Sequence, residues 1–180
     1  NHNYFLYDTL DSVAQYEKMR TIEENDVQAT VCLNRAQPDC SPAGTCMMYF
    51  TTLYMEDDWA RIKPQAYQKA KEFVANRMID RFEQDTGAKI RDHIEEISVA
   101  TPMTYARYCG HPQGVIYGYE SQYWDGLMPR LQMMGEDYGN GIRGLRFASA
   151  WSMRLSGYSS SYFAGDIAGR QTVGDIKREG

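Results

Sequence analysis

The residues best suited to chemistry lie near the end of the chain, in "GLRFASAWSMRLSGYSSSYFAGDIAGR", residues 144–170. A short apolar run precedes a glycine, three serines and a stretch with apolar residues at helical spacing. This order predicts a strand, a loop and the N-terminus of a helix. A helix N-terminus presents unpaired backbone N–H groups and about half a positive charge. The segment therefore predicts a receptor for an anion or a dipole that begins near Gly157.

Small residues at this predicted terminus suit close contact with a ligand. Gly157 permits close approach of the backbone, and Ser159 or Ser160 can cap the helix while donating a hydroxyl hydrogen bond. The alternative is an ordinary capped helix that packs on a sheet. The pattern alone leaves both interpretations open.

A second candidate stretch, "YARYCGHPQGVIYGYESQYW", is rich in aromatic residues. These side chains could line an apolar slot for a small molecule. They could equally fill a core or a subunit interface.

Composition excludes several classes of protein. The chain has 180 residues and a net charge of -5, and it has no cluster of Lys and Arg that would follow a nucleic-acid backbone. Its longest apolar runs, such as "CMMYF", are far too short to cross a bilayer. We therefore expect no nucleic-acid partner and no membrane-spanning segment.

The four cysteines show no CxxC spacing, which argues against a structural zinc site, and we expect no bound metal. No signal segment opens the chain, so we expect four reduced thiols in a cytoplasmic protein, with peripheral attachment to a membrane left open. The cysteines are Cys32, Cys40, Cys46 and Cys109.

Hydrophobic periodicity predicts both strands and helices. Residues 27–33 and 46–54 read as two strands joined by the turn-rich loop "NRAQPDCSPAGT", and this arrangement suggests an antiparallel pair. A helix is predicted from Pro64 to Gly87, and another can begin at Pro102. The elements show no regular βαβ alternation, so the class is α+β or a piece of a larger α/β fold.

One glycine motif has the spacing of a dinucleotide-binding fingerprint without its context. "GNGIRG", residues 139–144, matches the pattern G-x-G-x-x-G, but a polar stretch precedes it and a strand-like run follows it. A dinucleotide fingerprint needs the opposite order, with a strand before the glycines and a helix after them. We interpret this motif as a tight turn.

Three stretches together resemble the phytoene desaturase and carotenoid isomerase family of FAD-dependent oxidoreductases. "DHIEEISVATPMTYARYCGHPQGVIYGYE" is similar to that family's Thr-Pro, Arg-Tyr and Gly-x-Pro-x-Gly-x-x-Tyr-Gly signature. The segment at 144–170 resembles its closing flavin-binding strand, turn and helix. "PDCSPAGTCMMYFTTLY" resembles a loop and the strand after it in the substrate domain. The resemblance covers most of the chain from Pro38 onward.

The resemblance implies that FAD is the cofactor and that the substrate is an apolar small molecule. It implies cofactor-binding roles for Tyr117, Gly118, Ser149, Ala150, Trp151, Gly157, Tyr158, Ser159 and Ser160. It further implies a substrate-lining role for Tyr105, Tyr108 and Tyr119. No catalytic side chain is assigned, because hydride transfer to a flavin needs orientation and electrostatics more than an acid–base group.

Two departures from the family pattern matter. Family members begin with a true G-x-G-x-x-G unit that holds the ADP half of FAD, and this chain has none. We therefore expect a second polypeptide to carry the N-terminal nucleotide-binding domain. At Ala150, related amine oxidases have an acid, whereas the carotenoid branch tolerates alanine.

The resulting expectation is an α/β fold in two parts, incomplete without a partner chain. Residues 1–112 would be an α+β part of the substrate domain, and residues 113–180 would be the C-terminal strand and helix of a Rossmann-like FAD-binding domain. The reaction would be desaturation, saturation or isomerisation at a carbon–carbon double bond. The alternatives are a non-catalytic partner subunit that has lost the flavin, and another flavin enzyme such as an amine oxidase.

Overall fold

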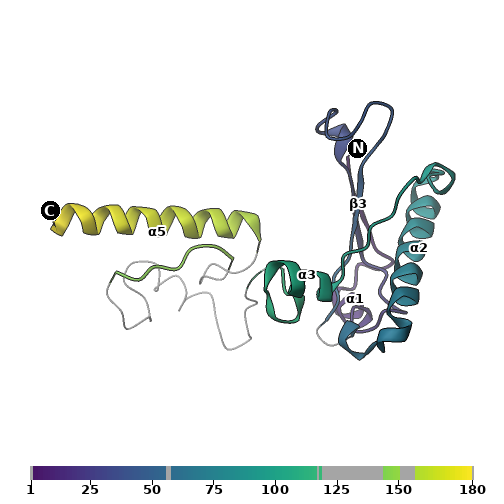
Figure 1. Cartoon of the computed structure of the whole chain (residues 1–180), viewed down its shortest axis with the longest axis horizontal. Coiled ribbons are helices and arrows are strands. Elements are labelled where there is room, and N and C mark those ends of the chain that lie inside the picture. Colours follow the sequence, from purple (N-terminus) through teal and green to yellow (C-terminus); the bar gives the residue numbers. More distant parts are fainter. Residues whose placement is uncertain (1, 56–57, 117, 119–143, 151–156, 180) are drawn as a thin grey trace. The chain divides into compact units, whose positions relative to one another are not determined.

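The computed structural model describes residues 2–55, 58–116, 118, 144–150 and 157–179 (Figure 1). The chain divides into two compact units, Asn1–Gly114 and Val115–Gly180. The described residues form helices and an antiparallel sheet, so the predicted mixed class is confirmed. The assignment of residues 1–112 and 113–180 to a substrate part and a FAD-binding part stays a prediction.

The first unit contains a three-stranded antiparallel sheet in the order β1-β2-β3. Its strands are β1 (Asn3–Leu6), β2 (Gln28–Cys32) and β3 (Met48–Thr51). At the centre of the sheet, Thr30 pairs with Tyr4 on one side and with Phe50 on the other. The predicted antiparallel pair is confirmed, with both strands shorter than the apolar runs that contain them.

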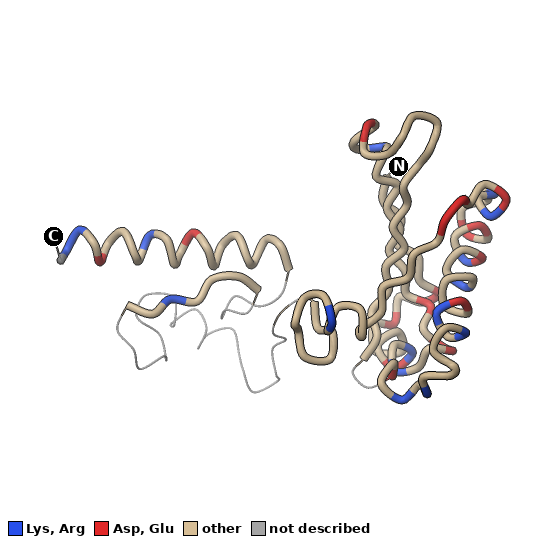
Figure 2. Tube along the Cα trace, viewed as in Figure 1, with Lys and Arg blue, Asp and Glu red and all other residues tan. Residues whose placement is uncertain are grey.

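The long helix α2 (Tyr67–Thr86) confirms the strongest helix prediction. A single 3₁₀ turn, Pro64–Ala66, leads into it, with proline at the first position, where its missing N–H leaves no bond unmade. Gly87 ends the helix with φ of +72°, a left-handed conformation that costs glycine little. Acidic and basic residues are both distributed along α2 (Figure 2).

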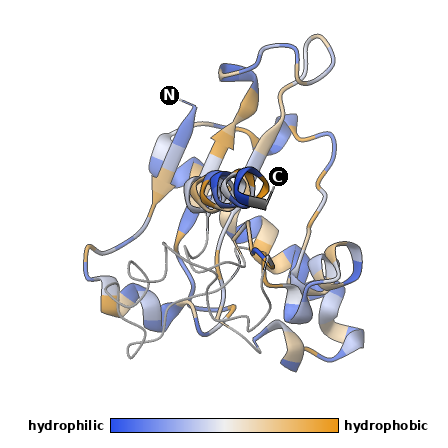
Figure 3. Ribbon diagram, turned by 90° about the vertical axis from the view of Figure 1, so that its left-hand side faces the viewer, coloured by the Kyte–Doolittle hydropathy of each residue, from blue (hydrophilic) through white to orange (hydrophobic). Residues whose placement is uncertain are grey.

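The core of this unit lies between the sheet and α2. The Phe82 ring packs edge-on against the rings of Tyr4 and Phe50, with centroids 5.3 and 5.6 Å apart. Nearer the N-terminus of the same helix, Val74 and Met78 form a buried cluster with Ile22 and Trp59. The strands themselves carry both apolar and polar residues (Figure 3). The sheet therefore depends on α2 to cover its apolar side chains.

Two shorter helices complete the first unit. The helix α3 (Pro102–Cys109) confirms the expected start at Pro102, and Thr101 before it forms a reciprocal capping box with Thr104. The helix α1 (Ser12–Lys18) was not predicted from the sequence. Asp11 caps it by accepting hydrogen bonds from the backbone N–H groups of Val13 and Ala14. A seven-residue helix is too short to show a clear hydrophobic period, which explains the omission.

The second unit is dominated by α5 (Tyr158–Glu179), which confirms the predicted C-terminal helix. Ala164 of this helix is buried, with 5% of its surface exposed. The segment 144–150 shows neither helix nor strand, so the strand predicted there is wrong over these residues. A strand requires a neighbouring backbone for its hydrogen bonds, and an apolar run in the sequence does not by itself supply one. The "GNGIRG" motif, interpreted from the sequence as a tight turn, lies at 139–144, and the structure describes only Gly144 of it.

Candidate functional site

The residues predicted to bind the cofactor all lie in the second unit, Val115–Gly180. Seven of them are described: Gly118, Ser149, Ala150, Gly157, Tyr158, Ser159 and Ser160. Tyr117 and Trp151, together with the substrate candidate Tyr119, lie outside the described residues.

Gly118 and Ala150 come into direct contact although 31 residues separate them. Gly118 has φ of +88°, and a Cβ atom placed on it would overlap the carbonyl group of Ala150 and lie 2.7 Å from the Ala150 Cβ. Residue 118 must therefore be glycine, both for its torsion and for its lack of a side chain. The contact shows that two of the predicted cofactor positions share one place in this unit.

The neighbouring residue Ser149 is unusual because its φ is +93°. Non-glycine residues rarely adopt this conformation, which costs about 1–3 kcal/mol and persists only where the surrounding structure enforces it. The backbone at 149–150 is thus held in an uncommon conformation where it meets Gly118. Strained backbone of this kind is frequent at ligand sites, although it does not identify the ligand.

An ion pair connects the segment 144–150 to α5. Arg146 Nη2 lies 2.5 Å from Asp175 Oδ2, and 13% and 29% of the two side chains are exposed. Asp175 also pairs with Arg178 on the same helix, at 2.5 Å. Because partly buried pairs are screened less than surface pairs, this contact helps to fix the segment against the helix.

The N-terminus of α5 has the open geometry that an anion receptor needs. Gly157 stands at the capping position with φ of +97°, and its carbonyl accepts the Ser161 N–H at 3.1 Å. A Cβ atom at Gly157 would have no neighbour within 4 Å. The N–H groups of the first turn, at Tyr158, Ser159 and Ser160, have no intrahelical partner by the geometry of any α-helix.

The predicted capping role of Ser159 or Ser160 is wrong. Gly157 occupies the capping position, and both serines lie inside the first turn. It is Ser161 whose hydroxyl donates to the Gly157 carbonyl, at 2.7 Å. The serines of the turn are therefore helical residues, and the torsion of Gly157 is what allows the chain to enter the helix.

Two of the predicted substrate-lining tyrosines lie on α3 in the first unit. Tyr105 is half-buried, whereas 79% of the Tyr108 surface is exposed and the Arg107 guanidinium lies 5.8 Å from the centre of its ring. Because they belong to the other unit, their grouping with the cofactor residues stays a prediction.

The glycines of the "GHPQG" motif have a structural explanation. Gly110 ends α3 with φ of +68°. Gly114 has φ of +74°, and a Cβ atom on it would overlap the backbone of Pro102 at the start of the same helix. The motif thus folds the chain back along α3, and its glycines need no ligand to account for them.

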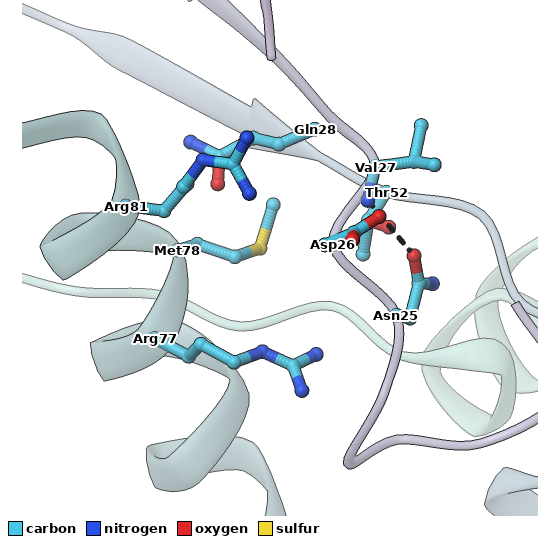
Figure 4. Close-up of a pocket in the computed structure, with 8 residues that line it drawn as sticks. All are labelled: Asn25, Asp26, Val27, Gln28, Thr52, Arg77, Met78 and Arg81. Carbon is cyan, nitrogen blue, oxygen red and sulfur yellow. Dashed lines mark hydrogen bonds between the residues drawn. The ribbon is translucent and has the colours of Figure 1, made fainter. Parts of the chain in front are cut away.

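A small cavity in the first unit was not foreseen from the sequence. It has a volume of about 70 Å³ and lies between the start of β2, the chain after β3 and one face of α2 (Figure 4). Its lining includes two arginines one helical turn apart and one acid, together with neutral residues. The lining residues are Asn25, Asp26, Val27, Gln28, Thr52, Arg77, Met78 and Arg81.

Ion pairs involve two of the charged groups that line this cavity. Asp26 pairs with Lys18, and Arg81 pairs with Asp85 and, at 2.6 Å, with Asp8. Arg77 donates to the neutral Glu23 carbonyl at 2.7 Å. Asp26 Oδ1 is buried and has no hydrogen-bond partner among the described residues. The spacing of the two arginines at i and i+4 was the sequence signal that could have indicated this cluster.

Tyr54 is a partly buried residue that packs against the core of this unit, close to the cavity residue Arg77. Its burial raises the pKa to about 12, although the nearby Arg77 guanidinium opposes the rise. Its hydroxyl lies 3.4 Å from Arg77 Nη2. At such a pKa the phenol stays protonated at neutral pH, so it cannot act there as a base.

In the described part of the chain, no three His, Cys, Asp or Glu side chains are placed to hold a metal ion. None of the described helices is both long and apolar enough to cross a membrane.

The fold and the site thus define a mixed α and β chain whose candidate site is built from backbone, at a glycine contact and a helix N-terminus. In comparisons with known proteins, the chain is 31% identical over 78 residues to the chloroplastic prolycopene isomerase of Daucus carota. The matched stretch covers 43% of this chain and 12% of the isomerase, so the chain spans a small part of that relative. The similarity gives distant support to the resemblance at the level of the family.

No family model matches the chain. No solved structure matches it either.

Proposed function

We propose that this chain forms the C-terminal part of a FAD-dependent oxidoreductase that acts on carbon–carbon double bonds of an apolar substrate. The observation that carries the proposal is the similarity to prolycopene isomerase, a protein whose name describes isomerisation of a polyene. The site geometry supports it, because two of the residues that resemble flavin-binding positions, Gly118 and Ala150, are in contact.

The described residues fit a flavin as a ligand. At the start of α5 the N–H groups have no intrahelical partner, and no described atom lies within 4 Å of a Cβ placed on Gly157, which suits a group that carries negative charge when reduced. Gly118 has no side chain and Ala150 has only a methyl group, which suits close approach of a flat ring. FAD, when bound, would accept a hydride from a carbon atom of the substrate.

The roles of this chain's residues follow from their positions. The first turn of α5, at Tyr158, Ser159 and Ser160, would orient the electronegative end of the flavin, and the 149–150 backbone would support it together with Gly118. Trp151 and Tyr117 would complete this site. Tyr105, Tyr108 and Tyr119 would form an apolar lining for the substrate.

The ADP half of FAD requires a glycine-rich strand–turn–helix unit that is absent from these 180 residues. We propose that a second polypeptide supplies this nucleotide-binding domain. The complete enzyme would then be an assembly in which this chain contributes one side of the flavin site.

The experiment is to purify the native assembly through an affinity tag on this chain, and to record its visible absorption spectrum and the intact masses of its chains. A yellow assembly that releases FAD on denaturation, with a second chain present, is the expected result. A colourless assembly would favour the non-catalytic subunit instead. If flavin is present, reduction by an amine and not by a polyene would identify an amine oxidase.

A further inference from the structure

Two cysteine sulfur atoms lie next to each other at the loop end of the β2–β3 hairpin. Cys32 is the last residue of β2, and Cys46 lies two residues before the start of β3. Their Sγ atoms are 3.3 Å apart, the distance of a hydrogen bond between thiols. Cys32 is partly buried and Cys46 is exposed, so a small reagent can reach the pair.

The backbone holds both cysteines at the base of one loop. The Leu33 N–H donates to the Met47 carbonyl at 3.0 Å, which extends the ladder past Cys32. The Met47 N–H donates to Asn34 Oδ1 at 2.7 Å and so ties the two ends of the loop again. The neighbours of both cysteines are thus fixed across the hairpin, and their thiols stay close without a covalent bond.

The loop between them is itself held by hydrogen bonds. Asn34 Nδ2 donates to Ser41 Oγ at 2.8 Å, and the Thr45 N–H and hydroxyl both donate to the Pro42 carbonyl, at 3.0 and 2.7 Å. This loop contains the third thiol, Cys40. The 3.3 Å contact between sulfur atoms joins Cys32 to Cys46 and does not involve Cys40.

We propose that Cys32 and Cys46 are a redox modification site that forms a reversible intramolecular disulfide. The oxidant is a small-molecule disulfide such as oxidised glutathione. One thiolate attacks a glutathione sulfur and releases one reduced glutathione, leaving a mixed disulfide on the protein. The second thiol then loses its proton and attacks the protein sulfur, which forms the Cys32–Cys46 bond and releases the second reduced glutathione. The protein dithiol loses two electrons and two protons, and the oxidised glutathione gains them.

The geometry favours the second step. A disulfide bond is about 2.05 Å long, so the two sulfurs need to approach by only about 1.3 Å, within the range of side-chain rotation. Burial raises the pKa of the Cys46 thiol, with further contributions from Cys32 and Cys40. Since the thiolate is the attacking species, the exchange is best followed at mildly alkaline pH.

The test treats the folded 180-residue chain with oxidised glutathione at mildly alkaline pH, then blocks the remaining thiols before unfolding. Trypsin cuts after Arg20, Arg35 and Arg61, which places Cys32 on peptide 21–35 and Cys40 and Cys46 on peptide 36–61. The expected result is a disulfide that links these two peptides, with two of the four thiols blocked and the other two released as free thiols by dithiothreitol. No flavin is needed, so the result is independent of the proposed function.

Matched variants identify the partners. Cys40→Ser should keep the link between the peptides, because the bond then runs through Cys46. Cys46→Ser should abolish it and leave a mixed disulfide with glutathione at Cys32. Circular dichroism of each variant checks that the chain is folded. Glutathione adducts without the peptide link, or a link that disappears in Cys40→Ser, would overturn the proposal.

Discussion

Gly157 has a positive φ, so every side chain placed there bears the same backbone strain. This strain makes Gly157→Ala the proper reference for Gly157→Glu. If the start of α5 faces a flavin, the carboxylate opposes the negative charge of the reduced ring, and Gly157→Glu should retain less flavin than Gly157→Ala. Bound flavin is measured from the visible absorption of the complete assembly.

A purely structural helix start predicts the opposite order. An acid at a helix N-terminus is favourable by about 0.3–1 kcal/mol. Gly157→Glu would then be at least as stable as Gly157→Ala and would retain at least as much flavin. Ser161→Ala removes the hydroxyl that donates to the Gly157 carbonyl and serves as a control outside the predicted site. Equal flavin content in the two Gly157 variants would leave the flavin role of this turn without support.

Gly110 and Gly114 form a matched pair for testing backbone contact. Both have a positive φ, but a Cβ atom has open space at Gly110 and overlaps the Pro102 backbone at Gly114. Gly110→Ala should therefore cost about 1–2 kcal/mol of unfolding free energy from torsional strain alone. Gly114→Ala should cost at least about 1–3 kcal/mol more, because the added methyl group must displace backbone.

Urea denaturation of each variant, followed by circular dichroism, measures this difference. Equal losses for the two variants would mean that Gly114 does not pack on Pro102. The result also separates a structural from a ligand-binding reason for the "GHPQG" motif, since no cofactor is present in the measurement.

At the scale of elements, α2 stabilises the sheet through one face. Phe82 has 4% of its surface exposed and contacts two rings of the sheet, whereas Phe73 on the same helix is 47% exposed. Phe82→Ala should lower the free energy of unfolding by about 3–5 kcal/mol, because it opens a cavity between helix and sheet.

Phe73→Ala is the control, with the same atoms removed from the same helix. It loses the contact with the Arg77 guanidinium, 5.3 Å from the ring centre, so a loss of about 0.5–1 kcal/mol is expected. Denaturant unfolding measures both variants. Similar losses would show that α2 does not cover the sheet through the Phe82 face.

At the scale of the whole molecule, the proposed function predicts that the 180-residue chain alone does not retain FAD. A single helix N-terminus contributes about 1 kcal/mol, whereas micromolar affinity needs about 8 kcal/mol. The chain is mixed with FAD and passed through gel filtration, and its absorption is compared with that of the complete assembly. Stoichiometric flavin on the isolated chain would contradict the need for a separate nucleotide-binding domain.

Local chemistry explains what the sequence by itself determined. Pro64 lies just before the start of α2, and Gly87 ends it. Thr101 and Pro102 begin α3, and Gly110 ends it. These limits are visible in the sequence because caps, proline and left-handed glycines act within a few residues of the chain. The two strands of the hairpin were visible for the same reason, through their apolar runs and the turn-rich loop between them.

Contacts between distant residues were decided by the tertiary structure alone. The approach of Gly118 to Ala150, the proximity of Cys32 and Cys46, and the pairing of Arg81 with Asp8 each join positions that no local pattern relates. The run at 144–150 has the composition of a strand but does not form one, because a strand depends on pairing with another segment and composition does not fix that pairing. Sequence periodicity reports which side of an element is apolar, whereas the folded chain determines what that side meets.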